Sequence, residues 1–320
     1  MKRILFLSIS VLPLFGLGMS AQAADAPPPA ECGIAGIVEG GVGYQGGNVT
    51  GSGLGSGGRA MGGNFTEFGE TAIGYGCGNW MAQLDGAFYH SGFSASIPLG
   101  QVNAEDNQGH IGGALFWRDP SVGRIGLAAS EILSNAHFVA GPTTDIGGSL
   151  TRVGAFGDFY ASDAITLGAG GFYVTGNPFS GLGQSLSETG FEGNVHAIFY
   201  ATDNISLGLQ GDMQLANLTE SGQVASWNGY AGSVEAEYLV PDTALSLFLG
   251  GRFASRSLAQ GGVSTATIND QQGYIGVKWA FGGPVSSLRA RDRAGTYDNT
   301  SVFDEKLPGL YYDAVNAESH

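Results

Sequence analysis

Phe199-Tyr-Ala-Thr-Asp-Asn-Ile-Ser-Leu-Gly-Leu209 shows most clearly how this chain folds. It reads as the aromatic end of one strand, a tight turn on Asp and Asn, and the start of a second strand. Related stretches recur at 115–127, 159–169 and 238–249, and 76–79 is a more divergent copy. Propeller blades share the period of about forty residues, but here each repeat has room for two strands of roughly ten residues. The repeat therefore predicts a series of β-hairpins.

Apolar and polar residues alternate along the predicted strands. In 205–210, Ile, Leu and Leu alternate with Ser, Gly and Gln. A period of two places one set on each face of a sheet. Aromatic residues gather at the strand ends, and Trp80 and Phe88 share one face at a separation of about 20 Å once a strand tilt of about 40° is allowed for. Two such belts match the apolar band of a transmembrane barrel, whereas a soluble β-sandwich would share the alternation alone.

Longer polar stretches rich in Gly and Ser separate the tight turns. They cover 46–66, 90–107, 132–148, 176–189, 216–226 and 255–270. Short connections on one side and long ones on the other are typical of outer-membrane barrels, whose long loops lie outside the cell. The sequence therefore predicts an all-β fold, a transmembrane antiparallel up-and-down β-barrel of about twelve strands with both termini in the periplasm.

The N-terminus has the features of a cleavable signal peptide. Lys2 and Arg3 precede an apolar run, and Ala21-Gln-Ala23 is a small-residue cleavage site. An uncleaved anchor is the alternative, but the run is short and contains Pro13. We expect residues 1–23 to be the signal peptide.

The remaining chain divides at the ends of the predicted strands. We expect a periplasmic N-terminal segment at 24–33, the barrel at 34–281 and a periplasmic C-terminal tail at 282–320. The tail carries Arg289, Arg291 and Arg293. It is interpreted as a mobile segment, with a lumen plug or a contact with periplasmic components as the alternatives.

Charge and cysteine content exclude several functions. The net charge of −15 argues against nucleic-acid binding, because phosphate requires a basic surface. Cys32 and Cys77 are the only cysteines, and in an exported chain they favour one disulfide at the periplasmic rim. They lack the spacing and the histidine partners of a zinc site, so we expect no metal.

The segment Tyr274-Ile-Gly276-Val-Lys-Trp279-Ala-Phe281 resembles the closing-strand signal of outer-membrane β-barrels. With the signal peptide and the hairpin repeat, residues 32–281 resemble a porin-like outer-membrane protein of Gram-negative bacteria. The resemblance implies contact with outer-membrane lipid and recognition of Tyr274, Gly276, Trp279 and Phe281 by the barrel assembly machinery. One departure is that the signal normally ends the chain, whereas here the tail follows it.

The alternation also predicts which charged and polar side chains line a pore. These are Glu39, Glu70, Asp85, Arg152, Asp158, Glu192, His196, Asp212, Glu235, Glu237, Arg252 and Lys278, with Arg118 and Arg124 less clearly placed. Acidic groups outnumber basic ones, and an acidic, water-filled constriction concentrates cations. We therefore expect passive diffusion of small hydrophilic solutes with a preference for cations. The sequence specifies neither the solute nor the oligomeric state.

Two other functions compete with a channel. One is a non-conducting adhesin or structural barrel, for which the Gly/Ser-rich loops would bind partners. The other is an outer-membrane enzyme, in which His196 would act with Glu192 and Asn194, close to Gln210 across the turn. Such a polar cluster is more often a lumen lining, and Gly53–Gly58 matches GxGxxG with no helix after it. We expect no catalytic residues and no cofactor.

Overall fold

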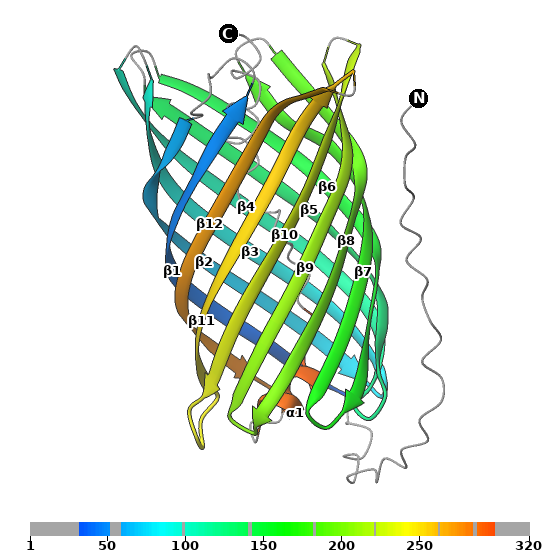
Figure 1. Ribbon diagram of the computed structural model, residues 1–320. Coiled ribbons are helices and arrows are strands. Elements are labelled where there is room, and N and C mark those ends of the chain that lie inside the picture. The colour runs from blue at the N-terminus through cyan, green and yellow to red at the C-terminus, as the bar shows by residue number, and fades with distance from the viewer. Residues whose placement is uncertain are drawn as a thin grey trace, which may run out of the picture.

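The computed structural model describes residues 32–51, 59–97, 100–139, 143–181, 184–220, 222–261, 263–283 and 287–297. The expected signal peptide, residues 24–31 and the tail beyond residue 297 lie outside these ranges. The described chain forms one tilted, closed barrel with a short helix inside one end (Figure 1).

Twelve strands make the wall, and they are β1 (Gly33–Gly51), β2 (Arg59–Cys77), β3 (Trp80–Ile97), β4 (Gly100–Asp119), β5 (Gly123–Val139), β6 (Thr143–Ser162), β7 (Ile165–Gly181), β8 (Gln184–Thr202), β9 (Ile205–Glu220), β10 (Gln223–Leu239), β11 (Leu245–Gln260) and β12 (Val263–Phe281). Each strand pairs antiparallel with its neighbours in sequence, and β1 pairs with β12 to close the barrel. Closure leaves no edge strand with unpaired backbone groups, which a lipid environment requires. The predicted fold class and strand number are confirmed.

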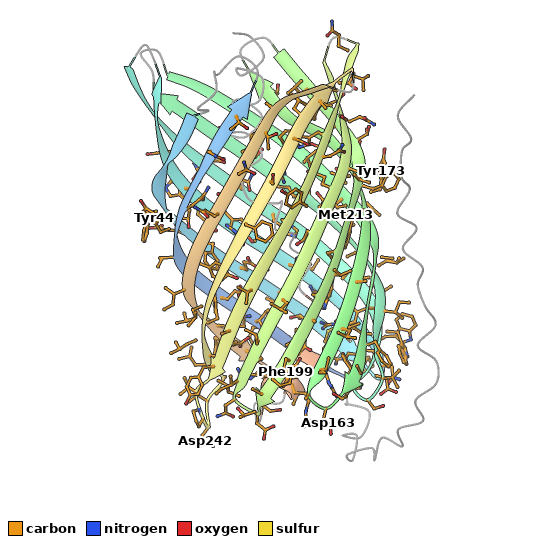
Figure 2. The ribbon with its side chains drawn as sticks, in the orientation of Figure 1. Tyr44, Asp163, Tyr173, Phe199, Met213 and Asp242 are labelled. Atoms are coloured by element: carbon orange, nitrogen blue, oxygen red, sulfur yellow. A yellow bond between two sulfur atoms is a disulfide. The ribbon has the colours of Figure 1, made fainter. Side chains whose placement is uncertain are left out.

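The predicted tight turns all lie at one end of the barrel, which we call the turn end; the opposite end is the far end. Asp163 and Asp242 mark two of these turns at the bottom of Figure 2. Side-chain hydrogen bonds and a glycine with positive φ stabilise these tight turns. The Asp119 carboxylate accepts hydrogen bonds from the Ser121 amide and hydroxyl at 2.9 and 2.6 Å. Gly78 has φ +59°, a backbone conformation that glycine adopts without steric cost.

The strands are longer than the sequence analysis expected. They contain 16 to 20 residues each instead of about ten. Most of the stretches expected to be long loops belong to paired strands, as β3 and β4 show by pairing as far as Ile97 and Gly100. The loop prediction was wrong because polar composition was read as loop, although an antiparallel ladder satisfies backbone groups in water as well as in lipid.

Apolar side chains cover the outer surface of the wall. Leu207 and Leu209 are exposed there, whereas Ser206 on the same strand is buried. Figure 2 shows Tyr44, Tyr173, Met213 and Phe199 on the outer surface. Nearer the far end the outer face becomes polar, with Thr151 bonded to Glu131 at 2.5 Å. The predicted alternation is confirmed, and apolar side chains such as Leu133 and Val224 are also exposed nearer the far end.

One disulfide and one helix complete the described structure. Cys32, just before β1, is bonded to Cys77 at the end of β2, as predicted. Helix α1 (Leu288–Ala294) follows the last strand and begins at Ser287, whose side chain accepts a hydrogen bond from the Ala290 amide. Within the described ranges, no helix is long and apolar enough to cross a membrane.

Candidate functional site in the barrel interior

Every predicted pore-lining side chain lies on the inner face of the wall. Their burial, ion pairs or contact with the interior cavity place them there, and they are Glu39, Glu70, Asp85, Arg152, Asp158, Glu192, His196, Asp212, Glu235, Glu237, Arg252 and Lys278. Their ion-pair and hydrogen-bond partners do not follow from the alternation of the sequence. The structure arranges them in several separate networks.

Lys278 is surrounded by carboxylates from two strands. Its Nζ lies 3.0 Å from Glu39 on β1, and 3.5 and 3.8 Å from Glu237 and Glu235 on β10. The same ammonium lies 5.3 Å from the centre of the Phe248 ring on the intervening strand β11. One cation therefore faces three carboxylates, which leaves the cluster with net negative charge.

A second network crosses three strands around Asp158. Arg124 Nε lies 2.5 Å from Asp158 Oδ2, and His196 Nε2 lies 3.2 Å from Asp158 Oδ1. Asp158 is on β6 and His196 is on β8, so the contact passes over Gly168 on β7. A Cβ atom at position 168 would overlap both side chains, so this contact requires glycine there.

Nearer the far end, Arg152 and Glu192 form a buried ion pair with a distance of 2.9 Å between Nε and Oε2. The Arg152 guanidinium also lies 4.4 Å from the centre of the Phe172 ring. Gln214 bridges Glu192 and Glu188 through its amide nitrogen. A buried charge of this kind is tolerated only when it is paired and hydrogen-bonded.

The remaining predicted residues are also paired. Asp85 contacts the His110 ring at 2.8 Å, and Asp212 accepts a hydrogen bond from Gln210 at 3.0 Å. Tyr89 donates to Glu70, and Arg252 interacts electrostatically with Asp270 and Glu70. His196 and Gln210 are register partners, as expected.

The Lys278 cluster, together with Arg124 and His196 of the second network, borders a cavity of about 320 Å³ inside the barrel. Phe68, Phe248 and Tyr274 form an aromatic cluster on its wall, with ring centroids 6.0 to 6.2 Å apart. The Lys278 cluster, Arg252 and His196 supply charged groups. Towards the turn end, Leu288, Asp292 and Tyr297 of the tail close the cavity. At about 30 Å³ per water molecule, the space holds roughly ten waters.

Residues 287–297 of the tail lie inside the turn end, which is the plug arrangement that the sequence analysis kept as an alternative. Gln83, Arg118 and Arg124 on the wall hydrogen-bond to this segment. The Tyr297 ring stacks on Phe156 with centroids 3.5 Å apart. Sequence pattern could not have placed this segment, because its contacts join residues far apart along the chain.

Several charged residues of the inner face were not predicted, or not predicted clearly, from the sequence. There are two causes. Asp106, Glu188, Arg256 and Asp270 lie within or at the edge of stretches expected to be loops, so no alternation was followed through them. Arg118 and Arg124 flank a turn, where the period of two is interrupted. Both are buried on the inner face.

The residues of the expected closing-strand signal lie on β12, which pairs with β1. Tyr274 points inward and donates to Glu235 at 3.1 Å, whereas Trp279 is exposed on the outer face. Gly276 is opposite Gly41 and Phe281 is opposite Gly36. The segment therefore closes the barrel; its recognition by assembly machinery stays a prediction.

Comparison with solved structures agrees with this architecture. An outer-membrane channel from Pseudomonas putida F1 has a TM-score of 0.55 at 8% identity, covering 81% of this chain and 98% of that one. The translocator domain of the autotransporter NalP from Neisseria meningitidis has a TM-score of 0.49 at 15% identity, covering 78% of this chain and 88% of that one. No protein-family model matches the sequence, and no curated relative matches it.

At these identities the likeness is one of fold, and the comparison with the P. putida channel carries it. Together with the closed wall and its apolar outer surface, it defines the class: the chain has the closed, antiparallel barrel fold of outer-membrane β-barrels.

Proposed function

We propose that this protein is an outer-membrane channel for passive diffusion of small hydrophilic solutes, with a preference for cations. The observation that carries the proposal is a cavity inside a closed barrel whose wall is lined with charged and polar groups. A barrel of twelve strands is intermediate between those filled by side chains, at about eight strands, and open porins, at about sixteen. A glycine on the inner wall, Gly208, borders the cavity and keeps space available for water.

The charge of the inner wall supports cation preference. Among the described residues, the inner-face acids are Glu39, Glu70, Asp85, Asp106, Asp158, Glu188, Glu192, Asp212, Glu235, Glu237 and Asp270, and the bases are Arg118, Arg124, Arg152, Arg252, Arg256 and Lys278. Acids exceed bases, so the interior attracts cations, and added salt should screen this attraction.

The location and partners follow from the same proposal. The turn end, where β1 begins and β12 ends, faces the periplasm, and the apolar band contacts outer-membrane lipid. The barrel assembly machinery recognises the closing strand through Tyr274, Gly276, Trp279 and Phe281. His196 serves as a lining residue and not as a catalyst, so His196→Ala should change conductance without abolishing a reaction.

Two variants that each neutralise one charge of the Lys278 cluster, a positive and a negative one, test the selectivity. Lys278→Gln should raise the permeability of K⁺ relative to Cl⁻, and Glu237→Gln should lower it, because the two side chains lie 3.5 Å apart in one cluster. A unit charge at such a distance is worth about 1 kcal/mol in water, so each change should reach up to about fivefold. Reversal potentials across a KCl gradient measure it.

Glu131→Gln is the matched control, because this carboxylate lies on the outer face, where Thr151 donates to it. It should leave the reversal potential unchanged. Anion selectivity in the wild type, or shifts of the same sign for Lys278→Gln and Glu237→Gln, would contradict the proposed selectivity.

A non-conducting structural or adhesive barrel is the second candidate. The observation that favours it is the tail segment inside the turn end, which obstructs a passage there. If a chain that lacks residues 284–320 still does not conduct ions, this alternative is favoured.

A further inference from the structure

We propose that residues 287–297 form a removable plug, and that its release from a dedicated socket at the turn end opens the channel. The socket consists of Gln83, Arg118, Arg124, Phe156 and Tyr200 on the inner wall. The inference rests on the proposed channel function. It adds a binding site for a peptide segment and a means of control.

One socket side chain, that of Gln83, recognises the backbone of the plug through two hydrogen bonds. The Gln83 amide donates to the Tyr297 carbonyl at 2.6 Å and accepts from the Tyr297 amide at 2.7 Å. This pair of bonds imitates one rung of a β-ladder, although the partner is a side chain. A glutamine that only filled space would not satisfy both groups of one residue.

Two socket arginines take up the carbonyls at the C-terminal end of α1. Arg118 donates to Ala294 and Gly295, and Arg124 donates to Thr296 at 3.0 Å and to Asp292 at 3.3 Å. The last carbonyls of a helix have no partner within it, and cations are favourable at that end. Arginines of the wall thus satisfy the free carbonyls at the end of the helix that lies in the passage.

Side chains of the plug add specific contacts. Asp292 accepts from Tyr200 at 2.5 Å and lies 3.3 Å from Arg124 Nη2. Tyr297 stacks on Phe156, and the Arg124 guanidinium lies 5.5 Å from its ring centre. Asp292 and Tyr297 therefore anchor both sides of the segment.

The turns of the rim bind the outer side of the plug. Arg289 donates to the Asp163 carbonyl at 3.2 Å, and Arg291 donates to the Thr243 carbonyl at 2.7 Å. Arg293 donates to the Ser162 carbonyl. Three arginines and one aspartate give residues 287–297 net positive charge, which complements the acidic interior.

The plug is held mainly by hydrogen bonds and ion pairs, and its apolar contacts are those of Tyr297 with Phe156 and of Leu288 with Tyr200 and Leu239. Hydrogen bonds to charged groups exchange readily with water when the segment leaves, and the vacated socket keeps a wall that is closed without it. The plug contacts side chains from β3 through β8, so its departure would unblock much of the turn end.

The test uses the full chain carrying Asp292→Ala and Tyr297→Ala together, which changes the plug and leaves the wall intact. In planar bilayers the double variant should conduct at least threefold more than the wild type. A synthetic peptide of residues 287–297, added on the turn-end side only, should restore the wild-type level. A scrambled peptide should not.

Tyr75→Ala is the control for the loss of a tyrosine, since Tyr75 is exposed on the outer face of β2. It should conduct like the wild type. Equal conductance of the double variant and a conducting wild type would overturn the plug and leave the channel standing. Both proposals would be overturned if no conductance were measured for the wild type, the double variant and a chain lacking residues 284–320.

Discussion

At the scale of single residues, the interior is organised by side-chain contacts that cannot be predicted from the alternation of polar and apolar residues. The period of two predicted the face of Asp158 and of His196, and the structure agrees. It could not predict that they meet, because β7 lies between their strands and only Gly168 allows the contact. The face on which a side chain lies follows from the local sequence. The side chains that it contacts depend on the register and tilt of the strands over the whole wall.

Gly168→Ala should separate His196 from Asp158, because the new Cβ would occupy the space between them. We expect the free energy of unfolding to fall by about 1–3 kcal/mol, the usual cost of overpacking. Gly208→Ala is the matched control on the same inner face, since its Cβ would approach nothing closer than 3.8 Å. Urea unfolding in detergent micelles measures both; equal stability of the two variants would show that Gly168 is not needed for space.

At the scale of elements, the sequence predicted the existence and direction of the strands better than their ends. The alternation in β9 is regular, and the strand was predicted with the correct faces. The ends were misplaced because Gly, Ser and Asn were read as loop, whereas Asn103 on β4 is still paired with Val139 on β5. Beyond the apolar band, backbone pairing and not side-chain hydrophobicity keeps the strands together.

The disulfide fastens the start of β1 to the end of β2, next to the seam where β1 meets β12. Thiol labelling of denatured, unreduced protein should find no free thiol. Reduction should lower the free energy of unfolding by about 2–4 kcal/mol, because the bond closes a loop across a separation of 45 residues. Two labelled thiols per chain would exclude the bond.

At the scale of the whole molecule, the barrel combines an apolar outer surface, an acidic inner wall and a positively charged segment in one end. The first suits a membrane location, and under the proposed function the second attracts cations. Under the proposed plugging, the third closes the passage while the wall keeps its shape. The position of the tail segment inside the barrel could not be predicted from the sequence pattern, because contacting residues such as Gln83 and Tyr297 are 214 residues apart in the chain.

The central claim is that ions pass through this barrel when the turn end is open. Refolded full chain, the Asp292→Ala/Tyr297→Ala variant and a chain lacking residues 284–320 should be recorded in planar bilayers under the same KCl gradient. The account predicts discrete conductance steps, larger in the two altered chains, with reversal potentials displaced towards that of K⁺. Bilayers that contain all three folded proteins and show no steps would contradict it.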